Sequence, residues 1–200
     1  KNLPPNLTYL SLNFSFNQPI DNLPPNLKYL KLGKKFNQSI NNLPNSITHI
    51  EFNDISEFNK SINKLPNNLK YLKLGMDFNY KIDELPNSVT HIEFYEFSLF
   101  NWPIKKLPNS LTHITFGEYF NENLDKNNLP NGITHIIFTK YSKFNKSIDN
   151  LPDSVTYIIF GEESEFNKPI NNLPENLKYL RLGKLFNHKI DNLPSGITHL

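Results

Sequence analysis

Apolar residues recur along the chain in short blocks, each preceded by the dipeptide Leu-Pro and followed by a polar stretch that carries one Phe-Asn pair. The ten Leu-Pro pairs begin at Leu3, Leu23, Leu43, Leu65, Leu85, Leu107, Leu129, Leu151, Leu173 and Leu193. Every interval between them is 20 or 22 residues. Two interleaved patterns at one period predict a single domain of about ten tandem repeats over residues 1–200.

The six residues after each Leu-Pro-x-x segment, such as 27–32 and 89–94, are rich in β-branched and aromatic types and alternate over their second half. This pattern predicts one short strand per repeat. The rest of each repeat carries Pro, Gly and several Asn residues, which leaves too little uninterrupted chain for a packed α-helix. The sequence therefore predicts an all-β fold, a parallel β-solenoid with little or no helix.

The Phe-Asn pairs are predicted to form internal ladders, because each pair occupies one point of its coil. We expect the Phe rings to stack roughly 4.8 Å apart, and the Asn amides to be buried and to bond backbone groups of their own and the adjacent turn. The pairs are Phe16 and Asn17, Phe36 and Asn37, Phe58 and Asn59, Phe78 and Asn79, Phe100 and Asn101, Phe120 and Asn121, Phe144 and Asn145, Phe166 and Asn167, and Phe186 and Asn187.

Repeat length follows the last strand residue. Coils of 20 residues end their strand with Leu, as at Leu32 and Leu74, whereas coils of 22 residues end it with Phe, as at Phe52 and Phe94. A bulkier inward side chain is expected to need a wider coil, because protein interiors are packed to constant density.

The array shows no recognisable cap, so we expect it to continue beyond both ends, with a further Phe two residues after Leu200.

Composition excludes several classes of function. The chain has no cysteine, which excludes disulfides, thiolate metal sites and cysteine nucleophiles. A net charge of +2 is spread along the chain, without the cationic stripe of a nucleic-acid binder. No apolar run reaches membrane-spanning length. We therefore expect neither nucleic acid nor a membrane as partner, and we expect no cofactor.

The repeat resembles the FNIP repeat, a short relative of the leucine-rich repeat found in social amoebae and giant DNA viruses. The segments 16–20 (Phe-Asn-Gln-Pro-Ile) and 166–170 (Phe-Asn-Lys-Pro-Ile) match best, while 120–124 departs most. The resemblance implies a curved, leucine-rich-repeat-like solenoid, often preceded by an F-box that links the repeats to a ubiquitin ligase. Residues 1–200 contain no F-box, so ligase components are expected only through a segment outside them, in host cytoplasm or in a virion.

The candidate binding face lies on the outward strand positions. One of them is Tyr or His in all ten repeats, and the next outward position carries Ile137 and Ile159 on neighbouring strands. An exposed apolar and aromatic patch of this kind favours protein binding, although the same rings could serve only as a stacking ladder. The patch comprises His113, His135, Ile137, Tyr157, Ile159 and Tyr179.

Two chemical interpretations of the same positions are less well supported. His91, His113 and His135 fall on successive strands, but a flat row lacks the convergent ligands and supporting shell of a zinc site. The pairs His49 with Glu51 and His91 with Glu93 share a face, but they lack a cleft, a nucleophile and an oxyanion site. The sequence therefore predicts a protein-binding scaffold that is not an enzyme and holds no metal. The alternative is a structural, self-assembling protein such as a component of a viral particle.

Overall fold

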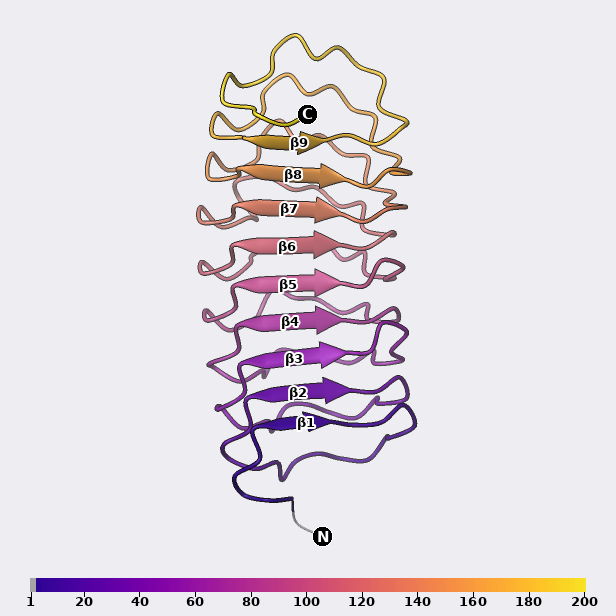
Figure 1. Ribbon diagram of the computed structural model, residues 1–200, viewed down its shortest axis with the longest axis vertical. Coiled ribbons are helices and arrows are strands. Elements are labelled where there is room, and N and C mark those ends of the chain that lie inside the picture. The colour runs from indigo at the N-terminus through magenta and orange to yellow at the C-terminus, as the bar shows by residue number, and fades with distance from the viewer. Residues whose placement is uncertain (1–2) are drawn as a thin grey trace.

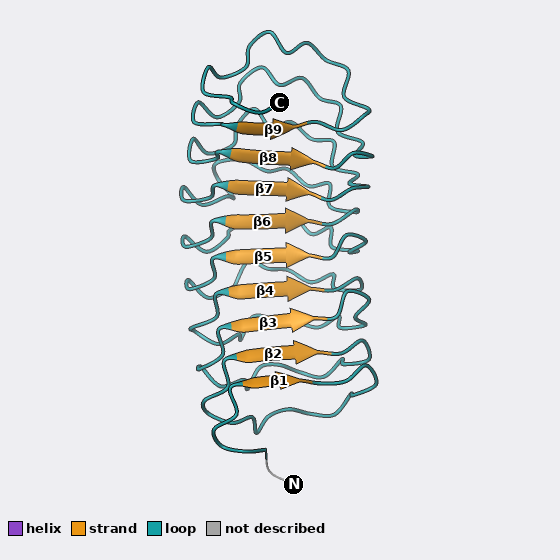
Figure 2. Ribbon diagram, in the orientation of Figure 1, coloured by secondary structure: helices purple, strands orange, loops and turns teal. Residues whose placement is uncertain are grey.

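The computed structural model describes residues 3–200, which form one stack of coils, from β1 at the bottom to β9 at the top of Figure 1, with a single nine-stranded parallel sheet along one side. Each strand pairs with the next one along the chain, and no α-helix occurs among the described residues (Figure 2). The strands are β1 Tyr9–Ser11, β2 Tyr29–Leu32, β3 His49–Phe52, β4 Tyr71–Leu74, β5 His91–Phe94, β6 His113–Phe116, β7 His135–Phe138, β8 Tyr157–Phe160 and β9 Tyr179–Arg181. The predicted parallel solenoid is confirmed.

The strands are shorter than predicted, because the first two residues of each predicted segment belong to a turn. In β2, Leu27 donates its backbone N–H to the carbonyl of Pro24 (3.1 Å), and the strand begins only at Tyr29. The same turn recurs after every Leu-Pro pair, so proline lies at the corner where the coil enters the sheet. After β9, residue His199 makes an isolated bridge to Tyr179 rather than a tenth strand.

The inward strand positions and the Phe-Asn phenylalanines form one continuous core. Phe36 to Phe166 are fully buried in this column, and consecutive rings lie 5.8–6.5 Å apart. That separation exceeds the expected strand spacing of roughly 4.8 Å. Rings on the outer side of the sheet lie closer on average, at 4.1–6.4 Å. The Phe rings of the column are therefore more widely separated than the rings on the outer side of the sheet.

Four of the five long coils hold their extra residues in a turn built on a buried serine. Ser56 is fully buried, and its Oγ accepts the backbone N–H of Phe58 (3.2 Å) while its own N–H donates to the carbonyl of Asn53. Ser98, Ser142 and Ser164 repeat this arrangement. The strand-end Phe52 stacks on Phe58 at 4.3 Å, as a second ring beside the Phe column.

The fifth long coil, which begins at Leu107, has the short loop after its strand and its extra residues after Leu124. Its strand-end Phe116 nevertheless stacks on Phe120 at 3.9 Å. The second ring therefore accompanies the greater length of the coil rather than the serine turn.

The asparagines form an unbroken ladder, but not in the buried form that we expected. The Oδ1 of Asn17 accepts the backbone N–H of Asn37 (2.9 Å), and this bond repeats through Asn187 at 2.9–3.3 Å. All nine amides are exposed or half-buried. The reason is alternation along extended chain: when the Phe of a pair points inward, the following Asn points outward. The ladder therefore joins the coils along their outside.

Candidate interaction face on the sheet

A stack of ten rings runs along the outward side of the sheet, from Tyr9 on β1 to His199. Each ring lies over its in-register neighbour on the next strand, and three histidines form the tightest part of the stack. The centroids of His91 and His113 are 4.2 Å apart, and those of His113 and His135 are 4.1 Å apart. The rings therefore form the stacking ladder that the sequence offered as one interpretation. A binding role is compatible with this ladder, because stacking also fixes the orientations of the rings.

A threonine hydroxyl fixes the orientation of each stacked histidine ring. The hydroxyl of Thr112 lies 3.1 Å from the carbonyl of Thr90 and 2.8 Å from Nδ1 of His113. His91 and His135 have the same arrangement with their preceding threonines. In each case Nδ1 is engaged by the threonine, while Nε2 has no hydrogen-bond partner among the described residues.

The central histidines are held neutral. Burial, followed by the neighbouring His135 and His91, lowers the pKa of His113 to about 4. Burial and the proximity of His91 also lower the pKa of His135. Both shifts have one physical origin, because rings stacked about 4 Å apart shield each other from water and cannot all carry positive charge.

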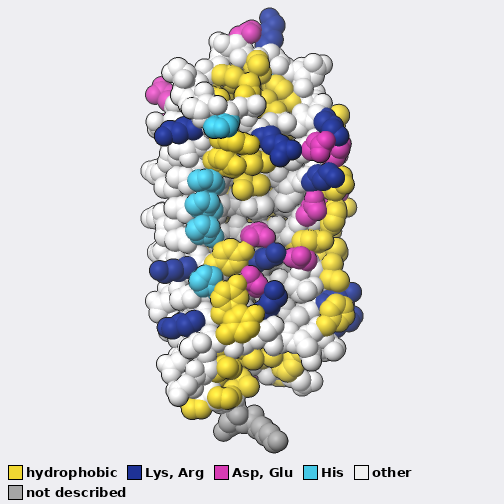
Figure 3. All heavy atoms as spheres, viewed as in Figure 1, with side chains coloured by type: hydrophobic (Ala, Val, Ile, Leu, Met, Phe, Trp, Pro, Cys, Tyr) yellow, Lys and Arg dark blue, Asp and Glu magenta, His cyan; other side chains and the backbone are white. Residues whose placement is uncertain are grey.

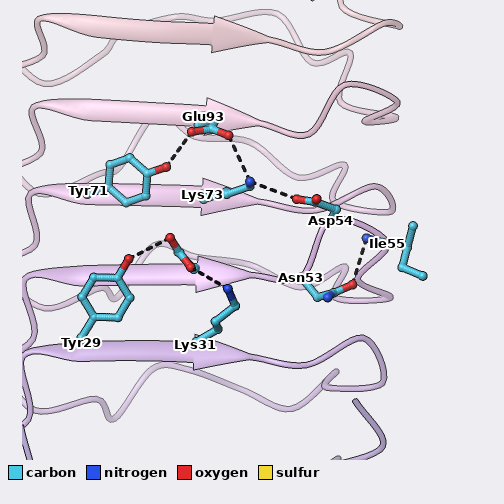
Figure 4. Close-up of polar contacts among 9 residues, drawn as sticks. Tyr29, Lys31, Asn53, Asp54, Ile55, Tyr71, Lys73 and Glu93 are labelled. Carbon is cyan, nitrogen blue, oxygen red and sulfur yellow. Dashed lines mark hydrogen bonds and ion pairs between the residues drawn. The ribbon is translucent and has the colours of Figure 1, made fainter. Parts of the chain in front are cut away.

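On the half of the face over β2–β5, the charged side chains bond one another (Figure 4). Tyr71 donates to Glu93 (2.6 Å), and the Nζ of Lys73 lies 3.1 Å from Glu93 and 3.0 Å from Asp54. On the preceding pair of strands, Tyr29 and Lys31 both contact one carboxylate, that of Glu51. The opposite charges on these strands therefore pair in two separate groups, and the second group also includes Asp54 of the loop after β3.

The two groups shift the pKa of their members in consistent directions. Burial, reinforced by the hydrogen bond to Glu51, raises the pKa of Tyr29 to about 12. Burial opposes ionisation of Glu51, but hydrogen bonds from Tyr29 and Lys31 outweigh it and lower the pKa of Glu51. Likewise the hydrogen bonds to Asp54 and Glu93 outweigh burial and raise the pKa of Lys73. These charges are satisfied internally.

The half over β6–β9 is different in character (Figure 3). Ile137 and Ile159 lie side by side in register, between Thr115 on β6 and Arg181 on β9. Both isoleucines are half-buried rather than fully exposed as expected, because side chains at the same position of neighbouring strands cover each other's flanks. His113, His135, Tyr157 and Tyr179 border them on the adjacent outward position. The structure thus brings all six predicted residues onto one continuous surface.

Sequence reasoning missed two aromatic clusters outside the sheet. In the loops after β5 and β7, Phe97 and Tyr141 stack at 5.8 Å across the shorter loop of β6. In the returning segments, Tyr80 and Trp102 line a groove. The signal that identifies the groove is a departure from the repeat, because the position of Tyr80 and Trp102 is polar in the other coils. The loop position of Phe97 and Tyr141 carries Ile55 and Glu163 in the other two long loops, so it has no comparable signal.

Residues 3–200 contain no group of three or more His, Asp or Glu side chains placed to hold a metal ion. Within the same range, no helix is long and apolar enough to cross a membrane.

Comparison with known proteins identifies one matching repeat family and a similar solved structure. The family model of the FNIP repeat matches residues 1–35, 16–54, 58–97, 100–141, 124–163, 144–184 and 166–200. Among solved structures, the crystal structure of CroV588, a giant-virus protein described as a novel circular LRR protein structure, is 34% identical with a TM-score of 0.77. The match covers 98% of this chain and 34% of CroV588, so the chain spans about a third of that protein.

A search of curated proteins finds no match. The family model covers most of the chain, and the solved structure shares its fold over nearly the full length. The chain therefore belongs to the FNIP repeat family.

Proposed function

We propose that this solenoid is a protein–protein interaction scaffold whose contact surface is the outward side of β6–β9. The observation that carries the proposal is the difference between the two halves of the face. Over β2–β5, the outward carboxylates and amines bond one another. Over β6–β9, the outward positions present two isoleucines and a ring stack, and no ion pair joins them among the described residues.

The stack supports such a role because it holds the contacting rings before a partner arrives. Tyr157 and Tyr179 lie 4.3 Å apart, and His135 lies 4.9 Å from Tyr157. Rings fixed in this way lose little conformational entropy on binding, which favours affinity. Aromatic side chains with polar tips also dominate binding energy at protein interfaces.

A more specific form of the proposal is that the bound protein is a substrate presented to a ubiquitin ligase. Its support is the association of FNIP repeats with F-box segments, which the resemblance implies, rather than a residue of this chain. The sheet would then recognise the substrate, and ligase components would bind through a segment outside these residues.

The test is affinity capture with the full-length protein and the double variant Ile137→Glu, Ile159→Glu, followed by mass spectrometry. Glu occupies the same strand position at Glu51 and Glu93, where each is in register with a lysine. Because the two introduced Glu side chains are in register with each other, circular dichroism and thermal unfolding first establish that the variant is folded. A control variant, Lys60→Gln with Lys189→Gln, changes the net charge by the same amount at exposed positions outside the sheet.

A protein that is captured by the wild type and the control but lost with the double variant supports the scaffold. Ligase components in the same capture support the substrate-recognition form. Equal capture by all three proteins would refute the proposed surface. Recovery of only the protein itself, or of particle components, would favour the alternative of a self-assembling structural protein.

A further inference from the structure

Three successive coils form a groove in their returning segments, between the Phe-Asn pair and the next Leu-Pro pair. Its volume is about 350 Å³, and its floor is formed by the buried side chains of Ile62, Ile82 and Leu85. Tyr80 and Trp102 line it, with 43% and 39% of their surface exposed. An apolar depression of this size lies within the range of sites that hold small ligands or short peptide segments.

The repeats themselves show that the fold does not require these two aromatic residues. Tyr80 and Trp102 occupy the position directly after a Phe-Asn pair. The other seven coils carry a polar residue there: Gln18, Gln38, Lys60, Glu122, Lys146, Lys168 and His188. Two large, partly exposed aromatic rings on neighbouring coils are therefore not explained by the packing of the solenoid, and they indicate a binding site.

The tryptophan is fixed in place at the groove. Its Nε1–H donates to the carbonyl of Asn79 on the preceding coil (2.7 Å), which sets the orientation of the indole ring. The ammonium of Lys81 lies 5.3 Å from the centroid of that ring, within the range of a cation–π contact. A ligand would thus meet a preformed aromatic surface.

Two polar side chains of the groove have hydrogen-bond partners within the protein. The Asp83 carboxylate accepts the backbone N–H of Lys105 (2.9 Å), and the Ser61 hydroxyl donates to Asn63 (2.8 Å). The groove lining carries two carboxylates, Asp83 and Glu84, against the single amine of Lys81. Besides its apolar surface, the groove therefore favours a cationic group on the ligand over an anionic one.

From this chemistry we propose that the groove binds a short proline-containing peptide in the polyproline II conformation, with a Lys or Arg beside the carboxylates of Asp83 and Glu84. Prolyl rings pack well on exposed aromatic side chains, and the polyproline II helix is already extended before it binds. The site lies outside the sheet face, so this inference is independent of the proposed scaffold surface.

Trp102 is the sole tryptophan of residues 1–200, and comparison with Trp102→Phe identifies its contribution to the emission of the full-length protein. The probe is a synthetic peptide of alternating Pro and Leu that ends in Arg, titrated into the full-length protein. We expect a saturable change in emission. Tyr80→Gln, which introduces a residue type found in other coils, should weaken binding by about tenfold or more. The control Tyr119→Gln removes an equally exposed ring elsewhere (40%) and should leave binding unchanged.

Two further peptides test the assigned chemistry. Replacing every Pro with Ala, or the Arg with Glu, should each reduce the affinity. The proposal is overturned if emission does not saturate, if Tyr80→Gln binds as well as the wild type, or if the Ala peptide binds equally. Saturation by a soluble oligosaccharide without any response to the peptide would overturn it in favour of a glycan site.

Discussion

Mild acid should destabilise the centre of the sheet, because the folded protein keeps His113 neutral. The pKa of His113 is lowered to about 4 in the fold, whereas an unfolded histidine has a pKa near 6.5. Between these values the unfolded chain binds the extra proton, so stability rises with pH. The contribution of His113 is therefore fully present above about pH 6.5, and it is lost progressively as the pH falls toward 4.

The size of the effect follows from the shift. Between about pH 7.5 and pH 5, a full shift of this kind corresponds to a loss of roughly 2 kcal/mol. The ring is only half-buried, so solvent screening should reduce the loss to about 1 kcal/mol. His135, whose pKa is also lowered, adds a contribution of the same sign.

The assay is urea unfolding at about pH 7.5 and pH 5, with the wild type compared to His113→Tyr. Tyr occupies this position on five of the strands, so the ring stack survives the change. The variant should lose about 1 kcal/mol less stability on acidification. The opposite change, Tyr157→His, extends the histidine row and should increase the acid sensitivity. Equal losses in the wild type and His113→Tyr would refute the argument.

Two substitutions test the contacts between coils. A Cβ at Gly75 would lie 2.5 Å from a backbone carbonyl of the preceding coil, so Gly75→Ala should cost roughly 1–3 kcal/mol in thermal or urea unfolding. Gly132→Ala, whose Cβ meets nothing closer than 3.5 Å, should be nearly neutral, and equal effects would contradict the steric reasoning. Asn101→Ala removes the acceptor for the N–H of Asn121 and should cost about 1 kcal/mol. Exposed Asn109 lies outside the ladder, so a similar loss in Asn109→Ala would count against the ladder.

Most of the fold could be predicted from the sequence, because the same pattern of apolar and polar residues recurs in every repeat. Spacing alone was enough to infer parallel strands, the Phe column and the position of the ladder. Spacing did not predict where the strands begin. The turn in which Leu27 donates its N–H to Pro24 is marked in the sequence only by the proline, which does not show how many of the following residues belong to the turn. The exposure of the asparagine amides, in contrast, follows from alternation along extended chain and could have been predicted once the Phe residues were placed inward.

The candidate sites were predicted less completely than the fold. The outward positions on β6–β9 follow from strand alternation, but the partial burial of Ile137 and Ile159 depends on how neighbouring side chains lean. The groove at Tyr80 and Trp102 brings together residues from three successive coils, which a consensus repeat conceals. Comparing each coil with the others, and asking where it departs, would have identified that groove.

The asparagine ladder makes every junction between coils chemically the same. Each Oδ1 takes up the N–H offered by the following coil, regardless of whether that coil has 20 or 22 residues. One whole coil could thus be removed or duplicated, and the new neighbours would still find matching partners. Loss of part of a coil would leave an unmatched junction. Such a chain can change length in whole units while its surface, and therefore its binding properties, varies from unit to unit.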